Sequence, residues 1–486
     1  MNKPIRVVAV FCLVLFVALL LNATYLMYVR SDELGKDPRN RRVITATYSR
    51  ERGAIIVGKD AIARSVASDD KYKFQRTYPE PFKYAPLTGY FAFFSRTGVE
   101  ASQNDVLSGD DSRLFVTRLV DLLSNTDPKG GNVQLTIDRA AQDAAFAGLE
   151  ALPGDAKGAV VALEPTTGRV LAMATTPTYD PNNFASHDFG AVDDLSRQLN
   201  QDPDDPLINR GIGTTLPPGS TFKLVTATAA IESGDYDADS LVPGGFEFKL
   251  PQSDTRIRNH DGGNCGGNRI TMTQAMQVSC NVSFLSLANE LGNEAMADQA
   301  EAFGFNATQL EDLGGQASSL YPRDMDPPQT AMSGIGQSSV TATPLQMAMV
   351  TAAIANDGDV MRPYVVDEVR APNASVLDRT DPQTVSNAMS STTAEELTKM
   401  LVATAESGTA TPAQIPGVEV AGKTGTAQTT PDRPPYAWFV SFAPADDPQV
   451  AVAVLVESSD TSRNEIAGGR LGGPIAKSVM EAVIGQ

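Results

Sequence analysis

A seven-residue stretch, Pro217-Pro218-Gly219-Ser220-Thr221-Phe222-Lys223, constrains the fold more than any other part of this 486-residue chain. Its two prolines and glycine stop whatever element precedes it. The residues that follow, 224–233, are almost all apolar or small, and Gly234 then supplies a helix stop. The pattern predicts a buried helix that begins at or next to Ser220. On such a helix Lys223 lies one turn from Ser220 and on nearly the same face.

This Ser-x-x-Lys spacing suits nucleophilic catalysis. A serine hydroxyl is too weak an acid to attack a carbonyl unaided, so it needs an adjacent base. A lysine amine serves as that base only when it is neutral, and an apolar helix environment lowers its pKa. The alternative is a serine that caps a helix and is followed by a first-turn lysine. The motif alone does not separate the two.

Two further motifs favour catalysis. Ser279-Cys280-Asn281 and Lys423-Thr424-Gly425-Thr426 follow the first serine in that order. The ordered set Ser-x-x-Lys, Ser-x-Asn and Lys-Thr-Gly is typical of penicillin-binding proteins and serine β-lactamases. With these motifs the chain resembles the class B penicillin-binding proteins, which are serine D,D-transpeptidases of cell-wall synthesis. It is most similar to their short actinobacterial type, penicillin-binding protein A.

The resemblance implies a reaction and a role for each motif residue. The nucleophile would attack the bond between the two terminal D-alanines of a peptidoglycan stem peptide, lipid-linked or in nascent glycan, and an amine of a neighbouring stem would resolve the acyl-enzyme into a cross-link. The implied roles are Ser220 as nucleophile, Lys223 as base, Ser279 as proton relay, Asn281 as the group that orients Lys223, Lys423 as a positive charge, Thr424, Gly425 and Thr426 as substrate-binding residues, and the amides of Ser220 and Thr426 as oxyanion hole.

The same resemblance implies β-lactam antibiotics as covalent inhibitors and no cofactor. It also implies partners at the cytoplasmic membrane, either a glycosyltransferase or proteins of the division complex, and a part in cell division and cell shape. Three alternatives stay open: a serine β-lactamase, a β-lactam sensor, and a division scaffold whose catalysis is dispensable. Class A lactamases carry a deacylating glutamate in a Glu-x-x-Leu-Asn loop, and no glutamate among Glu290, Glu294, Glu301 and Glu311 has that context.

A Walker A pattern, Gly-x-x-x-x-Gly-Lys-Thr, covers residues 417–424 and would indicate a nucleotide-binding loop. Such a loop needs a strand before its first glycine and a helix that starts at the lysine. Here the sequence predicts a strand at Val418–Ala421, between the two glycines. Gly425 and the proline-rich residues 431–435 then prevent a helix, so we reject nucleotide binding.

Residues 7–29 form an apolar run that is long enough to cross a bilayer as a helix. We expect a cytoplasmic stub at residues 1–6, a single transmembrane anchor at 7–29 and an extracellular catalytic part. A cleaved signal peptide is the alternative, but the run is long for one and no Ala-x-Ala-like site follows it cleanly. The orientation runs against the positive-inside tendency, because five basic residues follow the anchor: Arg30, Lys36, Arg39, Arg41 and Arg42.

The rest of the chain divides into a linker with a small β-rich, non-catalytic pedestal, residues 30–150, and a transpeptidase domain, residues 151–486. The pedestal is predicted from short strands at Val43–Tyr48, Ala54–Val57, Lys73–Tyr78 and Gly89–Ser95. A strand Val133–Ile137 and a helix capped by Asp138 would join the two parts. The catalytic part is predicted to be α/β, with helices on both faces of a five-stranded antiparallel sheet built from Ala159–Glu164, Arg169–Thr175, Val418–Ala421, Tyr436–Ala443 and Val450–Glu457.

Composition excludes several other functions. A formal net charge of −19 and a pI near 4.6 argue against nucleic-acid binding, which needs a basic patch. Two histidines without a Cys-x-x-Cys or His-Glu-x-x-His motif predict no metal site. Cys265 and Cys280 are the cysteines outside the anchor, where disulfides persist, and they form either a disulfide at the edge of the site or two unrelated buried thiols.

Overall fold

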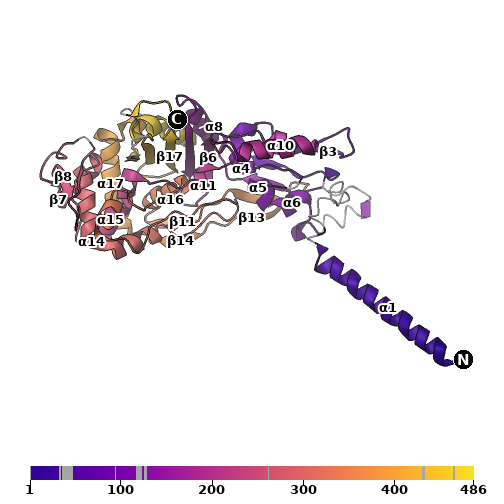
Figure 1. Cartoon of the computed structure of the whole chain (residues 1–486). Coiled ribbons are helices and arrows are strands. Elements are labelled where there is room, and N and C mark those ends of the chain that lie inside the picture. Colours follow the sequence, from indigo (N-terminus) through magenta and orange to yellow (C-terminus); the bar gives the residue numbers. More distant parts are fainter. Residues whose placement is uncertain are drawn as a thin grey trace.

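The computed structural model describes residues 2–31, 34, 48–93, 95–115, 123–124, 129–260, 262–429, 433–463 and 466–485. The N-terminal helix α1 (Asn2–Tyr28) stands apart from the rest of the chain in Figure 1. It is long and apolar enough to cross a membrane, and its side chains from residue 3 onward are exposed. Most of the predicted linker 30–42 and of the strand Val43–Tyr48 lies outside the described residues.

The larger part of the chain is built on a five-stranded antiparallel sheet with the order β15-β16-β17-β5-β6. A hairpin from the middle of the chain, β5 and β6, pairs through β17 with the two preceding C-terminal strands. This confirms the predicted sheet. Its strands are β5 (Lys157–Leu163), β6 (Val170–Thr176), β15 (Ala421–Ala427), β16 (Tyr436–Ala443) and β17 (Val450–Ser458).

Both faces of this sheet are apolar and both are covered by helices. Along β17, Val454 packs with residues of α8 (Arg139–Glu150) and α18 (Gly468–Ile484), whereas Leu455 belongs to the core on the side of α16 (Pro344–Ile354). Successive side chains of a strand point to opposite faces, so a strand that is apolar throughout needs cover on both. The prediction of helices on both faces is therefore confirmed.

Most of the remaining helices pack on the face of the sheet that α16 covers, and this region carries the candidate site. They are α11 (Arg210–Gly213), the 3-10 turn η2 (Gly219–Phe222), α12 (Lys223–Glu232), α13 (Met272–Gln277), α14 (Asn281–Ala302), α15 (Pro327–Ser333), α17 (Ser391–Ser407) and the turn η3 (Thr411–Ala413). Three short strand pairs join them: β7 (Leu241–Pro243) with β10 (Arg269–Thr271), β8 (Glu247–Lys249) with β9 (Arg256–Arg258), and β11 (Asp359–Met361) with β14 (Thr384–Asn387).

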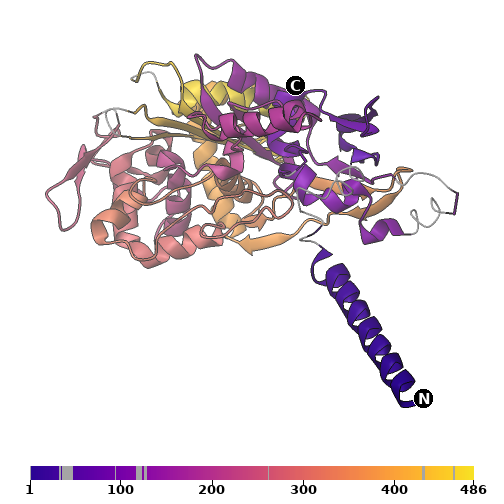
Figure 2. The ribbon, with the colours of Figure 1, turned by 45° about the vertical axis from the view of Figure 1, so that its right-hand side comes forward.

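A second sheet of six strands, in the order β13-β12-β4-β1-β2-β3, forms the part nearer to α1. Two of its strands come from far along the chain, and Figures 1 and 2 show them, in orange, among the purple N-terminal elements. The strands are β1 (Ile55–Val57), β2 (Asp60–Ala67), β3 (Phe74–Thr77), β4 (Asn132–Leu135), β12 (Val366–Arg370) and β13 (Val376–Arg379), and the short helices beside them are α4 (Pro81–Thr88), α5 (Gly98–Ser102), α6 (Asn104–Ser108) and η1 (Ser112–Leu114). The boundary at residue 150 stays a prediction.

Some predicted elements were wrong. Residues 180–206 are polar, and their Asp-Pro and Asn-Asn pairs predict a loop. The structure instead places α9 (Pro181–Phe184) and α10 (Phe189–Asn200) there. The aspartates that suggested a loop are helix caps: Asp180 accepts from the N–H of Asn182, and Asp188 from that of Ala191. The strand Gly89–Ser95 was also wrong in its described residues, because Gly89 ends α4 with a φ of 63° and only one bridge, Phe91 to Arg96, follows.

The strand predicted at Val418–Ala421 begins only at Ala421 and continues to Ala427, so it contains the Lys-Thr-Gly motif. Val418 instead makes an isolated bridge with Ile415, across a turn in which Gly417 has a φ of 80°. The helix predicted to start after Asp138, α8, is confirmed: the side chain of Asp138 accepts from the N–H of Ala141 at its first turn.

A buried carboxylate links the strands and short helices of the second sheet. Glu100 on α5 bonds through its two oxygens to Nε of Arg52 and Nε of Arg76, each at 2.6 Å, and accepts from the hydroxyl of Tyr78 at 3.2 Å. All these side chains are buried. Burial opposes ionisation of Glu100, but the charges of Arg76 and Arg52 outweigh it and lower the pKa of the carboxyl. The group is therefore an ionised centre between two buried guanidinium groups.

We expect Glu100→Gln to lower the free energy of unfolding by about 3–5 kcal/mol, because it leaves two buried arginines without a countercharge. The pKa of Glu100 is lower in the folded protein, so the stabilisation is present above the ordinary pKa of glutamate and is lost as pH falls. Urea denaturation of the full-length protein in detergent measures both effects. Asp254→Asn, which removes a fully exposed partner of Lys249, is the matched control. An equally small effect of both substitutions would contradict this role of Glu100.

Candidate active site

The candidate site lies where η2 meets β15, and two glycines permit this close approach. Gly219 has a φ of 55°, and a Cβ there would lie 2.9 Å from the carbonyl carbon and oxygen of Thr426. A Cβ on Gly425 would lie 2.9 Å from Cγ2 of Thr221. Both contacts are shorter than side chains tolerate. Ser220 therefore follows a residue whose backbone touches β15, which brings the backbone of Ser220 close to that of Thr426.

Two hydrogen bonds hold the turn before Ser220, and one of them comes from Trp438, which was not predicted from the sequence. Nε1 of Trp438, on β16, donates to the carbonyl of Pro217 at 2.9 Å. The N–H of Gly219 donates to the carbonyl of Gly336 at 3.0 Å. Trp438 is the one tryptophan of the chain and is fully buried, and a lone buried indole that needs an acceptor was the available signal.

The first predicted feature of the site, the helix after Ser220, is confirmed. A 3-10 turn covers Gly219–Phe222 and α12 starts at Lys223. Ser220 is partly exposed, and within the described residues its Oγ forms no hydrogen bond. Lys223 is fully buried, and its Nζ bonds to the second motif: to the carbonyl of Ser279 at 2.8 Å, to Oδ1 of Asn281 at 2.8 Å and to Oγ of Ser279 at 3.2 Å.

The third motif reaches the same hydroxyl. Nζ of Lys423, on β15, donates to Oγ of Ser279 at 2.8 Å and to the carbonyl of Thr424 at 2.8 Å. Lys423 is as completely buried as Lys223. The structure thus brings together Lys223, Ser279, Asn281 and Lys423, which come from three distant segments of the chain. Because Lys423 and Thr424 lie inside a strand and start no helix, the nucleotide-binding alternative is excluded.

The two amines cannot easily be charged together. Burial, followed by repulsion from Lys423, lowers the pKa of Lys223 well below its ordinary value. Burial alone lowers the pKa of Lys423 to about 7. Among the described residues no carboxylate bonds to either amine. Of the two amines, Lys223 is therefore the one that gives up its proton more readily, because it is both buried and repelled by its neighbour.

The hydrogen bonds fit this distribution of charge. A neutral amine has two N–H donors, and Nζ of Lys223 has two carbonyl oxygens at 2.8 Å to receive them. Its lone pair then remains to accept a proton. Ser279 Oγ, between the two amines, is able to accept from Lys423 and to donate onward. Ser279 itself has a φ of 58°, a conformation that a residue with a side chain adopts only when its surroundings impose it.

Thr424 and Thr426 are partly exposed on β15. The hydroxyl of Thr424 donates to that of Thr409 at 2.7 Å. Thr409 follows α17 and was not predicted from the sequence. Its backbone N–H donates to the carbonyl of Gln277, two residues before Ser279. The hydroxyls of Thr424 and Thr426, together with the buried charge of Lys423, make this side of the site suited to binding an anion.

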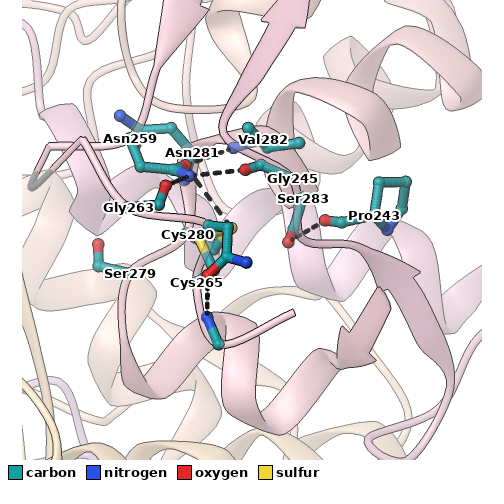
Figure 3. Close-up of a disulfide and its surroundings, with 12 residues drawn as sticks. Pro243, Gly245, Asn259, Gly263, Cys265, Ser279, Cys280, Asn281, Val282 and Ser283 are labelled. Atoms are coloured by element: carbon teal, nitrogen blue, oxygen red, sulfur yellow. Dashed lines mark hydrogen bonds between the residues drawn. A yellow bond between two sulfur atoms is a disulfide. The ribbon is translucent and has the colours of Figure 1, made fainter. Parts of the chain in front are cut away.

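A disulfide borders the site on the other side. The structure contains the bridge between Cys265 and Cys280, and it ties the loop after β9 to the residue between Ser279 and Asn281 (Figure 3). Residues 252–268 are rich in glycine, which predicts a loop. The structure places the short strand β9 (Arg256–Arg258) in this segment, before the bridge.

Comparisons with known proteins agree with this geometry. The model of the penicillin binding protein transpeptidase domain matches residues 158–481, and that of the penicillin binding protein A dimerisation domain matches residues 52–133. The peptidoglycan D,D-transpeptidase PbpA of Mycolicibacterium smegmatis is 42% identical over all of this chain and 99% of its own length. PbpA of Mycobacterium tuberculosis H37Rv is 40% identical over the same shares.

Solved structures give the same result. The crystal structure of PBPA from Mycobacterium tuberculosis superimposes with a TM-score of 0.85 at 38% identity and covers 90% of this chain and 100% of that one. Its penicillin G acyl-enzyme complex gives a TM-score of 0.84 at 39% identity with the same coverage. The chain therefore belongs to the class B penicillin-binding protein transpeptidases, the family that includes penicillin-binding protein A.

Proposed function

We propose that this protein is a peptidoglycan D,D-transpeptidase that works through an acyl-enzyme on Ser220 and that β-lactams inhibit by acylating the same oxygen. The observation that carries the proposal is the convergence of Lys223 and Lys423 on Oγ of Ser279, next to the turn that presents Ser220. This arrangement supplies a neutral base, a proton relay and a positive charge within one hydrogen-bonded group. The relatives' printed activity, peptidoglycan D,D-transpeptidase, supports the same conclusion.

Acylation starts at Ser220. The lone pair of Lys223 takes the proton of Oγ as the oxygen attacks the carbonyl carbon between the two terminal D-alanines. The N–H groups of Ser220 and Thr426, on segments that touch at Gly219, stabilise the oxyanion. Ser279 gives its hydroxyl proton to the nitrogen of the departing D-alanine and is reprotonated by the Lys223 ammonium. The C–N bond breaks, an ester forms, and Lys223 is neutral again.

The second half of the reaction reverses these proton transfers. An amine from a neighbouring stem peptide attacks the ester carbon, and its proton returns through Ser279 or Lys223 to Oγ of Ser220. An amide cross-link forms and the serine is released.

The terminal carboxylate of the donor peptide is held by the hydroxyls of Thr424 and Thr426, with Gly425 between them, and by the charge of Lys423. A β-lactam carries an equivalent carboxylate and occupies the same position.

The surroundings of the enzyme follow from α1. We place it as a single-pass anchor in the cytoplasmic membrane, with the stub 1–6 inside and the catalytic part outside, where nascent peptidoglycan lies. We propose residues 30–150 as linker and pedestal and 151–486 as the transpeptidase domain. The partners proposed are a glycosyltransferase or division-complex proteins. The anchor helix and the substrate, which lies outside the cell, support this orientation.

The β-lactamase alternative is disfavoured by the hydrogen bonds of the site. Hydrolysis of the acyl-enzyme needs a base that activates water. Among the described residues, the side-chain partners of Lys223, Ser279 and Lys423 are amines, an amide and a hydroxyl, and none is a carboxylate. This agrees with the absence of the Glu-x-x-Leu-Asn pattern after Asn281.

We expect penicillin to form a covalent adduct on Ser220 that persists for many minutes, because water attack lacks general-base assistance worth about 10²–10⁴-fold. Intact-mass and peptide mass spectrometry of the full-length protein in detergent, after excess drug is removed, locates the adduct and follows its loss. Ser220→Ala, checked for an unchanged unfolding temperature, should not be labelled. Labelling of this variant would refute the nucleophile, and return of the wild type to its free mass within seconds would indicate a lactamase.

We expect Lys223→Ala to slow acylation by about 10²–10⁴-fold, the usual size of a general-base contribution. The pH profile of the wild type separates a neutral lysine from an ordinary one. The base works when unprotonated, so the rate falls only as pH drops through its lowered pKa. The rate constant measured by stopped flow should therefore rise between about pH 6 and about pH 8 by clearly less than the roughly hundredfold that a lysine of ordinary pKa requires. The larger rise would contradict the assignment.

A further inference from the structure

Helix α14 begins beside the catalytic groups without a cap from its own N-terminal residue. The first N–H groups of a helix have no partner within the helix and need acceptors from outside. Cys280 occupies the capping position, but its side chain forms no capping hydrogen bond and its sulfur is joined to Cys265. The acceptor for the first turn comes from a residue far back in the chain.

Asn259, the residue after β9, supplies this acceptor. Its Oδ1 accepts from the N–H of Asn281 at 3.0 Å and from the N–H of Val282 at 3.1 Å. Its Nδ2 donates to the carbonyls of Gly245 at 2.9 Å and Gly263 at 2.8 Å (Figure 3). An asparagine amide has two donors and two lone pairs, and all four are used here. Asn259 as a whole residue is 6% exposed, so water cannot replace these bonds at low cost.

The residue before it fixes the side chain of Asn281. The carbonyl of Arg258 accepts from Nδ2 of Asn281 at 3.1 Å. This bond directs Oδ1 of the same amide toward Nζ of Lys223, at 2.8 Å. If the amide turned over, its NH₂ group would face the donors of Lys223 and its oxygen would face the Arg258 carbonyl, so both bonds would be lost. The pair Arg258 and Asn259 thus holds both the backbone and the amide of Asn281.

We propose that Asn259 is a positioning residue for acylation, which acts through Asn281 on Lys223. By capping the first turn of α14 it fixes the position of the Asn281 backbone. Because it directly follows Arg258, it also fixes the position of the carbonyl that orients the Asn281 amide. Nζ of Lys223 is then held by the amide of Asn281, one helical turn from Ser220. This inference rests on the proposed acyl-enzyme function. Among the described residues Asn259 forms no hydrogen bond to Ser220 or Lys223, so its effect is one of geometry.

A neighbouring contact offers a matched control. Ser283, on the first turn of α14, donates through Oγ to the carbonyl of Pro243 at 2.7 Å and is buried. Like Asn259, it ties the start of α14 to the region before β8. It makes no hydrogen bond to Asn281 or to Lys223. Loss of Ser283 therefore loosens the same helix without releasing the Asn281 amide.

The test is a double-mutant cycle in the full-length protein in detergent. Fluorescent penicillin reports the saturating rate constant of Ser220 acylation and the concentration of half-saturation, at a temperature below the unfolding of every variant. We expect Asn259→Ala to slow the saturating rate roughly 10- to 100-fold, with half-saturation little changed. Ser283→Ala should stay within about twofold of the wild type. In an Asn281→Ala background, Asn259→Ala should cost less than about threefold, because its route to Lys223 is already lost.

A merely structural Asn259 gives a different pattern. Equal fold-losses from Asn259→Ala in the wild-type and Asn281→Ala backgrounds, or an equal loss from Ser283→Ala, would overturn the proposal. If Asn259→Ala does not fold, Asn259→Asp replaces it in the cycle with the same non-additivity expected, since it keeps the acceptor at the helix N-terminus and loses both donations. An unlabelled wild type would refute the acyl-enzyme function itself, whereas a labelled wild type and an Asn259→Ala variant of equal rate would refute this inference alone.

Discussion

Both buried amines of the site contact a single hydroxyl oxygen, Oγ of Ser279, and the rest of the catalytic part is arranged to make that contact possible. Lys223 and Lys423 lie 3.2 Å and 2.8 Å from it, and both are fully buried. Two ammonium groups in such a place would repel each other without a countercharge, so one of them gives up its proton. The repulsion that makes the pair costly is also what prepares Lys223 to act as a base.

Holding this contact requires segments that are far apart in the chain. Gly219 lets the turn of Ser220 lie on β15, and the indole of Trp438 holds Pro217 from the next strand. On the opposite side, Asn259 and the disulfide of Cys280 hold the start of α14, next to a serine in a left-handed conformation. Strained residues persist where several surrounding contacts impose them, and Ser279 is surrounded by such contacts on both sides.

The sequence allowed the parts that depend on local pattern to be predicted. The continuous apolar run of β17 needs a sheet covered on both faces, and Ser220 and Lys223 are related by helical spacing alone. The wrong predictions have physical causes: aspartate is favoured both in turns and at helix N-termini, and Asp180 and Asp188 cap helices where the sequence predicts a loop. Asn259 and Trp438 were missed because their value lies in long-range hydrogen bonds, which a spacing rule does not contain. The same holds for β12 and β13, which join a sheet begun some 300 residues earlier.

The central claim is that Lys223 is neutral while Lys423 is the more protonated of the two. Carbon NMR of the full-length protein with lysine labelled at Cε, titrated with pH, tests it most directly, because the chemical shift of Cε reports the charge of the adjacent amine. Lys223→Arg and Lys423→Arg assign the two resonances. We expect the Lys223 resonance to have the neutral shift at neutral pH and that of Lys423 to titrate near pH 7. Two resonances that both keep the shift of a charged amine up to the ordinary lysine pKa would contradict the claim.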